Sequence, residues 1–358
     1  MLQYLFNVLS APIYLNTVYT RCFMAFFIAL ILALSFGDRL LAFLHAKQRN
    51  GQPIREDGPK THLQTKKGTP TMGGILILGS ALISILMCAD LCNVFVWSVI
   101  AVLSVYGFVG ATDDYVKVTK QTSNAMSAKM KLLLQFSTAA FVVVMVSYQT
   151  PENSRFVLTI PYVVNWGMDL FWFYIPFAMV VIAGASNAVN LTDGLDGLAS
   201  GLMIIALPVF MVIAYICGSE LVDKVYMMPI YGADEIAITC AAVIGGCLGF
   251  LWFNAAPAKM FMGDTGSLSL GAFLGTVAVI LKHEILLAIV GFVFVAEALS
   301  VMIQVFWFRK TGGKRFFKMA PIHHHFEQCG WPETRVVARF WVVGFVLAIL
   351  GFMAIQYK

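Results

Sequence analysis

Charge is scarce in this chain: only 12% of its 358 residues are Asp, Glu, Lys or Arg. Soluble domains carry about 25% charged residues. Hydrophobic residues make up 59% of the sequence instead, and the length leaves no room for a second, soluble domain. These proportions exclude an ordinary soluble protein and predict one integral membrane domain over residues 1–358.

Cysteine motifs and a cleavable leader are also lacking. The seven cysteines are scattered, and no pair has the spacing of a metal-ligand motif, so neither a disulfide framework nor a cysteine metal site is expected. The first apolar stretch begins near Cys22, is long enough to span a membrane, and is not followed by a small-residue cleavage site. We expect it to remain as the first membrane helix.

Long apolar runs dominate what is present. Runs of about 20 apolar residues predict spanning helices. We expect ten of them, at roughly 22–44, 71–91, 93–112, 131–148, 170–187, 197–217, 235–253, 268–281, 285–308 and 336–355. The connection 149–169 is rich in β-forming residues and contains Pro161, which predicts a small hairpin with an edge strand. The predicted fold is an all-α polytopic membrane protein with a small periplasmic β-hairpin.

The basic residues predict the orientation. The connections on one side of the predicted helices hold 17 of the 24 Lys and Arg residues, and the other side, with both chain ends, holds five. Because Lys and Arg are enriched in cytoplasmic loops, the first side is expected to be cytoplasmic and both termini periplasmic. The polar clusters described next also fall on the cytoplasmic side.

The first cluster is the stretch 187–197, Asn-Ala-Val-Asn-Leu-Thr-Asp-Gly-Leu-Asp-Gly. Asn187, Asn190, Asp193 and Asp196 recur at every third position, which on a helix keeps neighbours on one side. Charged groups near a bilayer are costly and usually functional. A capped turn between helices would also favour Asn and Asp, but two of each in one short connection favour a binding site.

Two adjacent carboxylates, Asp113 and Asp114, follow the helix expected at 93–112. Adjacent carboxylates repel each other unless a cation or amine is near, and Mg²⁺ is commonly bound by one or two carboxylates together with substrate phosphates. Lys129 and Lys131, at the start of the next helix, are candidate counter-charges. The alternative is a solvated helix end, although acidic residues there oppose the helix dipole.

Two glycine-containing stretches precede predicted helices. In 66–74, Lys66 and Thr71 stand before a glycine pair, an arrangement that suits a phosphate at a helix start. The alternative is a basic flank with Pro70 starting the helix. In 261–267, two glycines frame Asp264, and Phe261 is placed to stack on a planar ring. Here the alternative is a simple helix cap.

Three consecutive histidines, His323 to His325, follow a basic run. In an extended segment the first and third would point one way and the second the other, so convergence on one metal is not expected and contact with a phosphate is favoured. Surface histidines in a basic loop are the alternative. Glu297 and Gln304 lie seven residues apart on one face of the helix expected at 285–308. A buried Glu in a membrane helix is either functional or a partner for another helix.

Several acids and bases without a Ser or Cys nucleophile motif indicate Mg²⁺-dependent phosphoryl chemistry at the cytoplasmic membrane face. That location implies one lipid substrate and one water-soluble substrate. A transporter or channel would spread its polar residues through the membrane depth, and a structural scaffold would leave the clustered carboxylates without a role. Both alternatives are disfavoured.

Six blocks carry a family resemblance: GTPTMGG, DDYVKV, NAVNLTDGLDGLA, FLWFN, FMGDTGS and MAPIHHHFE. With them the chain resembles, over essentially its whole length, the bacterial phospho-N-acetylmuramoyl-pentapeptide-transferases of the polyprenyl-phosphate N-acetylhexosamine-1-phosphate transferase superfamily. The triple histidine favours this branch over the sister branch that transfers N-acetylglucosamine-1-phosphate.

The resemblance implies transfer of phospho-N-acetylmuramoyl-pentapeptide from its UDP-linked donor to undecaprenyl phosphate, which gives lipid I and UMP for peptidoglycan synthesis. It also implies Mg²⁺ as cofactor, a homodimer in the bacterial inner membrane, and no nucleic-acid partner. The lipid phosphate either attacks the donor directly, which we favour because a metal-bound carboxylate is a weak nucleophile, or attacks a phospho-sugar already attached to a carboxylate.

Site residues are carried over by motif position. Asp264 is the implied Mg²⁺ ligand, Asp113 and Asp114 are the acidic pair near the lipid phosphate, and His323 joins them as a catalytic group. The implied substrate contacts are Lys66, Thr71, Lys129, Asn187, Asn190, Asp193, Gly194, Leu195, Asp196, Phe261, Gln304, His324 and His325.

Overall fold

The structure, a computed structural model, describes residues 16–48, 66, 68–120, 126–164 and 167–358. Most of the connection expected at 45–70, including Lys67, therefore lies outside the described residues. The long helices are α2 (Val18–Lys47), α4 (Gly74–Cys88), α5 (Val94–Lys120), α6 (Ala128–Gln149), α7 (Tyr174–Thr192), α8 (Leu198–Gly218), α9 (Asp234–Asn254), α10 (Gly263–Ile280), α12 (Phe292–Lys310) and α14 (Glu333–Phe352). The short helices are η2 (Glu152–Ser154), η3 (Phe171–Phe173), η4 (Glu220–Lys224), α11 (Glu284–Val290) and α13 (Ile322–Gln328).

Within the described part of the chain, nine helices are long and apolar enough to cross a membrane. The tenth apolar helix, α4, has only 15 residues. At about 1.5 Å per residue it rises roughly 22 Å, less than the hydrocarbon core of about 30 Å. A polytopic membrane protein is therefore supported, whereas the predicted count of ten spans is not confirmed.

Two predicted helix boundaries were wrong. The segment expected as one helix at 285–308 is divided at Gly291 into α11 and α12. The helix expected to end at residue 112 continues to Lys120, so Asp113 and Asp114 lie two turns before its end. The acidic pair does not end the helix because both carboxylates find partners inside the protein, as described below.

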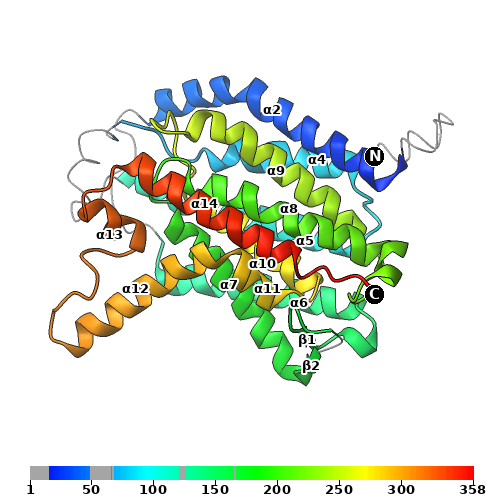
Figure 1. The fold of residues 1–358 in the computed structure, drawn as a ribbon. Coiled ribbons are helices and arrows are strands. Elements are labelled where there is room, and N and C mark those ends of the chain that lie inside the picture. The colour runs from blue at the N-terminus through cyan, green and yellow to red at the C-terminus, as the bar shows by residue number, and fades with distance from the viewer. Residues whose placement is uncertain (1–15, 49–65, 67, 121–125, 165–166) are drawn as a thin grey trace.

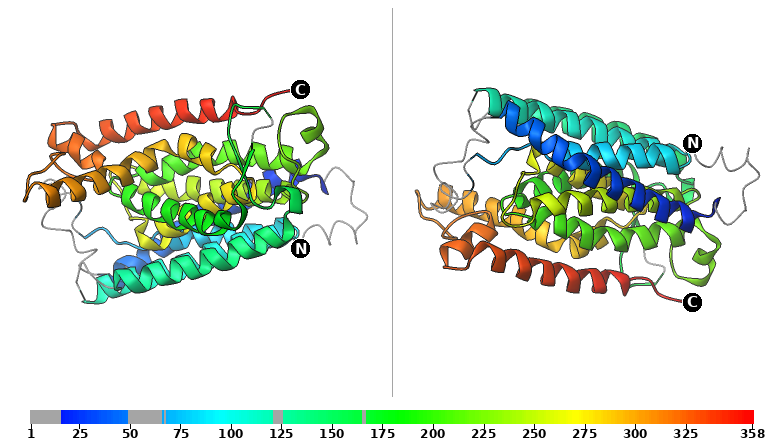
Figure 2. Two further views of the ribbon diagram at one scale, coloured as in Figure 1. Left: turned by 90° about the horizontal axis from the view of Figure 1, so that it is seen from below. Right: turned by 90° about the horizontal axis from the view of Figure 1, so that it is seen from above.

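Helix α10 forms the centre of the bundle. Of its residues, 94% are buried, and it packs on both α5 and α7. In Figure 2, α6 and α14 lie on opposite flanks of the bundle, with α10 between them. Asp264, in the first turn of α10, is the one residue of this helix that is not fully buried, since its side chain is 14% exposed, so the helix presents this carboxylate at the end of the bundle.

Small residues allow α2 to pack closely on α9. Every fourth residue of α2 from Ala25 to Gly37 is buried, namely Ala25, Ala29, Ala33 and Gly37. A Cβ atom at Gly245 of α9 would lie 2.2 Å from the backbone oxygen of Phe26. Such stripes of small residues let membrane helices approach until their backbones touch.

The bundle has two chemically different ends. One end gathers the start of α4, the end of α5, the end of α7, the start of α10 and helix α13, and the other end holds the start of α2, the C-terminus and the sheet (Figure 1). In that sheet β1 (Val157–Thr159) pairs antiparallel with β2 (Gly167–Asp169). The predicted polar clusters thus meet at the end opposite the sheet.

A substitution at Gly245 tests the close contact between α2 and α9. We expect Gly245→Ala to lower the free energy of unfolding in detergent by about 1–3 kcal/mol, because overpacking forces the two helices apart. The change is measured as a lower unfolding midpoint. Gly79→Ala is the matched control, since a Cβ atom at exposed Gly79 has no neighbour within 4 Å. Equal midpoints for the two variants would contradict this account of the packing.

Candidate functional site

Two carboxylates and two ammonium groups meet between α5, α6 and α10. Lys117 Nζ lies 2.7 Å from Asp113 Oδ2 and 3.2 Å from Asp264 Oδ2. Lys131 Nζ lies 3.2 Å from Asp113 Oδ2 and 2.6 Å from Asp264 Oδ2. The two carboxylates therefore share both lysines and face the same small space. We call this set of four residues the acidic–lysine cluster.

The continuation of α5 explains half of this cluster. Asp113 and Lys117 are four residues apart, so they lie on the same face of α5. Lys131 comes from the first turn of α6, and the backbone N–H of Met126, just before that helix, donates to Asp113 Oδ1 over 2.9 Å. The prediction that Lys131 is a counter-charge of the acidic pair is confirmed.

Asp114 serves a different partner from its neighbour. Its Oδ1 accepts from the backbone N–H of Asp264 (3.1 Å), and its Oδ2 accepts from the backbone N–H and the hydroxyl of Thr265 (2.9 and 2.8 Å). The first N–H groups of a helix lack partners within the helix, so this buried carboxylate satisfies the start of α10. Asp114 thereby fixes Asp264 in place.

Gly263 permits that close approach. It adopts φ +73°, and a Cβ atom there would lie 2.4 Å from Asp114 Oδ2 and 2.6 Å from the hydroxyl of Thr71. Thr71, a predicted substrate contact, is buried at this point, and its hydroxyl has no partner in the described part of the chain. The glycine frame predicted around Asp264 thus belongs to the packing of α10 against α5.

Helix α7 supplies an amide to the acidic–lysine cluster. Asn190 Nδ2 donates to Asp264 Oδ1 (3.0 Å) and to Ser267 Oγ (2.8 Å). Asn187, one turn earlier, donates instead to Gln135 Oε1 on α6 (2.9 Å). The structure therefore brings Asn190 to the carboxylates, whereas Asn187 joins α7 to α6.

The turn between α7 and α8 carries Asp193 to Gly197. Asp193 follows the last residue of α7, and burial together with the nearby carboxylates of Asp264 and Asp114 raises its pKa well above the usual range. Among the described residues no group donates a hydrogen bond to its carboxylate. Leu195, also predicted as a substrate contact, is buried in the same turn.

A second ion-pair set lies at this turn. Lys66 Nζ contacts Asp196 Oδ1 (2.8 Å) and Glu333 Oε1 (2.6 Å), and it lies 5.7 Å from the ring centre of half-buried Phe261. Burial lowers the pKa of Lys66, but the two carboxylates outweigh burial and raise it above its usual value. Lys66 is therefore a fixed ammonium beside the aromatic ring.

The histidines do not lie in an extended segment, so that prediction was wrong. They belong to α13, where the backbone of Ile322–Gln328 is helical and the three rings point in different directions around the axis. His323 is fully buried: its Nδ1 lies 3.0 Å from Glu297 Oε2 of α12, and its Nε2 faces Gly194. A Cβ atom at Gly194 would lie 2.3 Å from that nitrogen.

The other two histidines stay nearer the surface. His324 Nδ1 lies 2.7 Å from Glu327 Oε2. His325 Nδ1 accepts from the backbone N–H of Lys318 over 3.1 Å. The rings therefore have partners that set their orientation, and contact with a phosphate stays a prediction.

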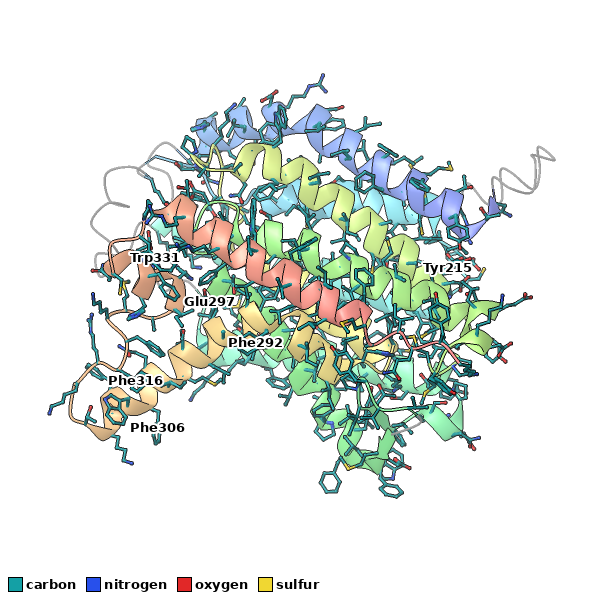
Figure 3. The ribbon with its side chains drawn as sticks, in the orientation of Figure 1. Tyr215, Phe292, Glu297, Phe306, Phe316 and Trp331 are labelled. Atoms are coloured by element: carbon teal, nitrogen blue, oxygen red, sulfur yellow. The ribbon has the colours of Figure 1, made fainter. Side chains whose placement is uncertain are left out.

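Gln304 has a structural contact with the segment that follows α12. Its Oε1 accepts from the backbone N–H groups of Phe316 and Phe317 (3.1 and 2.9 Å), which ties the segment after α12 to that helix. Figure 3 shows Glu297 near the inner part of α12, while Phe306 and Phe316 lie at its outer end. The two side chains predicted on one face of this helix thus serve two different neighbours.

Three residues that contact the predicted site residues were missed by the sequence analysis, namely Lys117, Gln135 and Glu333. One residue that was included, Lys129, has no ion pair with them in the described part of the chain. Lys129 is exposed and has no ion-pair partner in the described part of the chain. Lys117 was not selected, although its spacing from Asp113 is a helix-pair signal. Gln135 and Glu333 carry no such signal, because their partners are distant in sequence.

The acidic–lysine cluster could hold a hard cation. In the described part of the chain no group of three or more His, Cys, Asp or Glu residues is arranged to bind a metal. Asp113 and Asp264 nevertheless present the one or two carboxylates by which Mg²⁺ is commonly bound when substrate phosphates and water complete its shell. The donor set thus fits an ion that binds together with a phosphate.

Comparison with known proteins places the chain in a family. The glycosyl transferase family 4 profile matches residues 96–282, and the phospho-N-acetylmuramoyl-pentapeptide-transferase signature 1 matches residues 66–78. Proteins named phospho-N-acetylmuramoyl-pentapeptide-transferase are 48% identical in Rickettsia felis (94% of this chain, 93% of the relative), 49% in Caulobacter vibrioides (94% and 93%) and 50% in Desulfotalea psychrophila (92% and 91%). The resemblance inferred from the six sequence blocks is thereby confirmed, and the chain belongs to the phospho-N-acetylmuramoyl-pentapeptide-transferase family.

Proposed function

We propose that this protein transfers phospho-N-acetylmuramoyl-pentapeptide from its UDP-linked donor to undecaprenyl phosphate, producing lipid I and UMP. Membership of the family supports the reaction. The observation that carries the proposal is the acidic–lysine cluster, because Asp113 and Asp264, which are distant in sequence, share Lys117 and Lys131 at one end of the bundle. Such a site can hold two phosphate-bearing substrates beside each other.

A divalent cation would supply positive charge that this site lacks. In the acidic–lysine cluster the two carboxylates of Asp113 and Asp264 balance the two ammonium groups of Lys117 and Lys131, so no positive charge is left over for a diphosphate. Mg²⁺, held by Asp264 with Asp113, would add that charge and stabilise charge that develops on the diphosphate. Asp114 acts differently, because its hydrogen bonds to Asp264 and Thr265 hold the start of α10.

Lys117 and Lys131 are assigned to the phosphate of the lipid acceptor. A phosphate monoester has a second pKa near 6, so undecaprenyl phosphate is largely dianionic at neutral pH and needs no base to become a nucleophile. Lys117 and Lys131 would attract this phosphate and hold it in line with the donor, while Asp113 orients both lysines. Direct attack on the donor's β-phosphate follows from this arrangement.

The donor nucleotide is assigned to the second ion-pair set. The ring of Phe261 lies 5.7 Å from Lys66 Nζ, which also contacts Asp196, and Asp196 belongs to the turn that carries Asp193, Gly194 and Leu195. We assign His324 and His325, which lie on α13, to the diphosphate and sugar, as the resemblance implies. His323, whose Nδ1 contacts Glu297 on α12, anchors the helix that carries them.

The arrangement in the membrane follows from the basic residues. Among the described residues, the end of the bundle that holds the site carries most of the Lys and Arg residues, so we assign it to the cytoplasm and the sheet and both termini to the periplasm. The protein would then lie in the bacterial inner membrane, where the water-soluble donor and the lipid acceptor meet. A homodimer is proposed from the resemblance alone.

Removing one charge tests the metal site. We expect Asp264→Asn to reduce turnover by about a hundredfold to a thousandfold, the range for loss of one preorganised electrostatic group. The variant should still fold, since the amide keeps the volume of the carboxylate, but with a lower unfolding temperature because Lys117 and Lys131 lose an ion-pair partner. Asp38→Asn, at an exposed position of α2, is the control. Turnover near wild type in Asp264→Asn would show that the cation lies elsewhere.

Direct attack predicts that the protein is never covalently loaded. Incubating the enzyme with Mg²⁺ and a donor radiolabelled in its phospho-sugar, without undecaprenyl phosphate, should leave no label on denatured protein, because the proposed nucleophile is the lipid phosphate. Asp264→Asn serves as the background control. Stoichiometric label on the wild-type chain would replace this mechanism with one that uses a carboxylate nucleophile.

Stacking predicts an asymmetric loss of affinity. We expect Phe261→Ala to weaken UMP binding by about tenfold, in line with 1–3 kcal/mol for a base stacked on an aromatic ring, and to leave the KM for undecaprenyl phosphate unchanged. Phe261→Tyr keeps the ring and should bind UMP like the wild type. Equal losses for nucleotide and lipid would indicate general damage to the site.

A further inference from the structure

Glu333 is a site residue that belongs to none of the six family blocks. It is the first residue of α14, next to Pro332, and its side chain is 21% exposed. Its Oε1 accepts from Lys66 Nζ over 2.6 Å and from the backbone N–H of Asp196 over 2.7 Å. One carboxylate oxygen thus joins three segments that are far apart in the sequence.

The Asp196 turn is fixed by three further contacts. Asp196 Oδ1 faces Lys66, and its Oδ2 accepts from the backbone N–H of Ala258 over 2.9 Å. The backbone N–H of Gly197, which has φ +77°, donates to Asn254 Oδ1 over 3.1 Å. Glu333 adds a hydrogen bond and an ion pair that join this turn and Lys66 to the first residue of α14.

Helix α14 is itself held firmly in place. A Cβ atom at Gly201 of α8 would lie 2.2 Å from the indole of Trp341, so the two helices meet with no space between them. The start of α14 therefore has a defined position relative to the turn that precedes α8. A carboxylate fixed there can set the position of Lys66, a long side chain with many rotamers.

The charges show what Glu333 adds. Lys66 carries one positive charge and faces two carboxylates, Asp196 and Glu333. Without Glu333 the ammonium would keep one carboxylate partner and regain rotational freedom. The ring of Phe261, 5.7 Å from Lys66 Nζ, would then lose a cation with a defined position.

We propose that Glu333 is a positioning residue for the donor nucleotide: its carboxylate holds Lys66 and the Asp196 turn in the arrangement that receives the donor. This inference rests on the proposed function, since it assigns Lys66 and Phe261 to the nucleotide. Glu333 itself touches neither substrate in this scheme. It acts through Lys66, from a helix outside the motifs that carry the chemistry.

The test is Glu333→Gln in the full-length enzyme, which preserves the shape of the side chain and an acceptor for the Asp196 N–H. We expect the donor KM and the Kd of UMP to rise by about tenfold, as for the loss of a hydrogen bond to a charged group. The kcat and the KM for undecaprenyl phosphate should stay within about twofold, because the loss is of uniform donor binding. Glu220→Gln is the matched control, since this exposed Glu is likewise the first residue of a helix, the short η4, but lies at the other end of the bundle.

A double-mutant cycle separates positioning from general stability. In the Lys66→Met background, the factor by which Glu333→Gln raises the Kd of UMP should be smaller than in the wild-type background by about threefold or more. The reason is that the effects of coupled residues are not additive. UMP binding remains measurable even where turnover is lost. Glu333→Asp keeps the charge and withdraws it by one methylene, and it should give a smaller increase in Kd than Glu333→Gln.

Three results would overturn the proposal. They are an unchanged donor KM in Glu333→Gln, a loss confined to kcat, and effects of Lys66→Met and Glu333→Gln on UMP binding that simply add. Failure of the proposed function looks different, because the wild-type enzyme would then not convert the UDP-linked muramoyl-pentapeptide donor at all. The same wild-type assay with UDP-N-acetylglucosamine shows whether the sister reaction takes place instead.

Discussion

The structure depends on how two buried carboxylates, Asp113 and Asp114, and the partly buried carboxylate of Asp264 are kept together in a protein with few charges. Asp114 is satisfied by the N–H groups at the start of α10, and Asp113 and Asp264 are satisfied by two lysines that they share. An isolated buried charge is strongly unfavourable, and pairing with hydrogen bonds makes it tolerable. The same contacts that satisfy these groups also fix α5, α6 and α10 relative to one another, so the site and the fold are stabilised together.

Adjacent residues with the same side chain have separate tasks here. Asp113 points to the shared lysines, whereas Asp114 points to the backbone of α10. Successive residues of a helix project about 100° apart, so two neighbouring carboxylates reach different elements without being forced together. This division removes much of the repulsion expected for an acidic pair and leaves Asp113 to face the acidic–lysine cluster.

The C-terminal quarter of the chain contacts the turn between α7 and α8 at two points. His323 of α13 contacts Gly194, and Glu333 of α14 accepts a hydrogen bond from the backbone N–H of Asp196. Segments that contribute no carboxylate to the acidic–lysine cluster can therefore determine the shape of this turn.

The sequence by itself determined the membrane class, most helix positions and the residues that carry the family resemblance, because apolar runs and motif blocks are local properties of the chain. It also placed Lys131 near the acidic pair. Only the tertiary structure decided that α5 runs on to Lys120, that α13 is a helix and that Asp113 and Asp114 turn to different partners. It alone showed Glu333 beside Lys66 and Gln135 beside Asn187. These contacts join residues far apart in the sequence, and such pairs meet only through the packing of helices, for which a single sequence has no periodic signal.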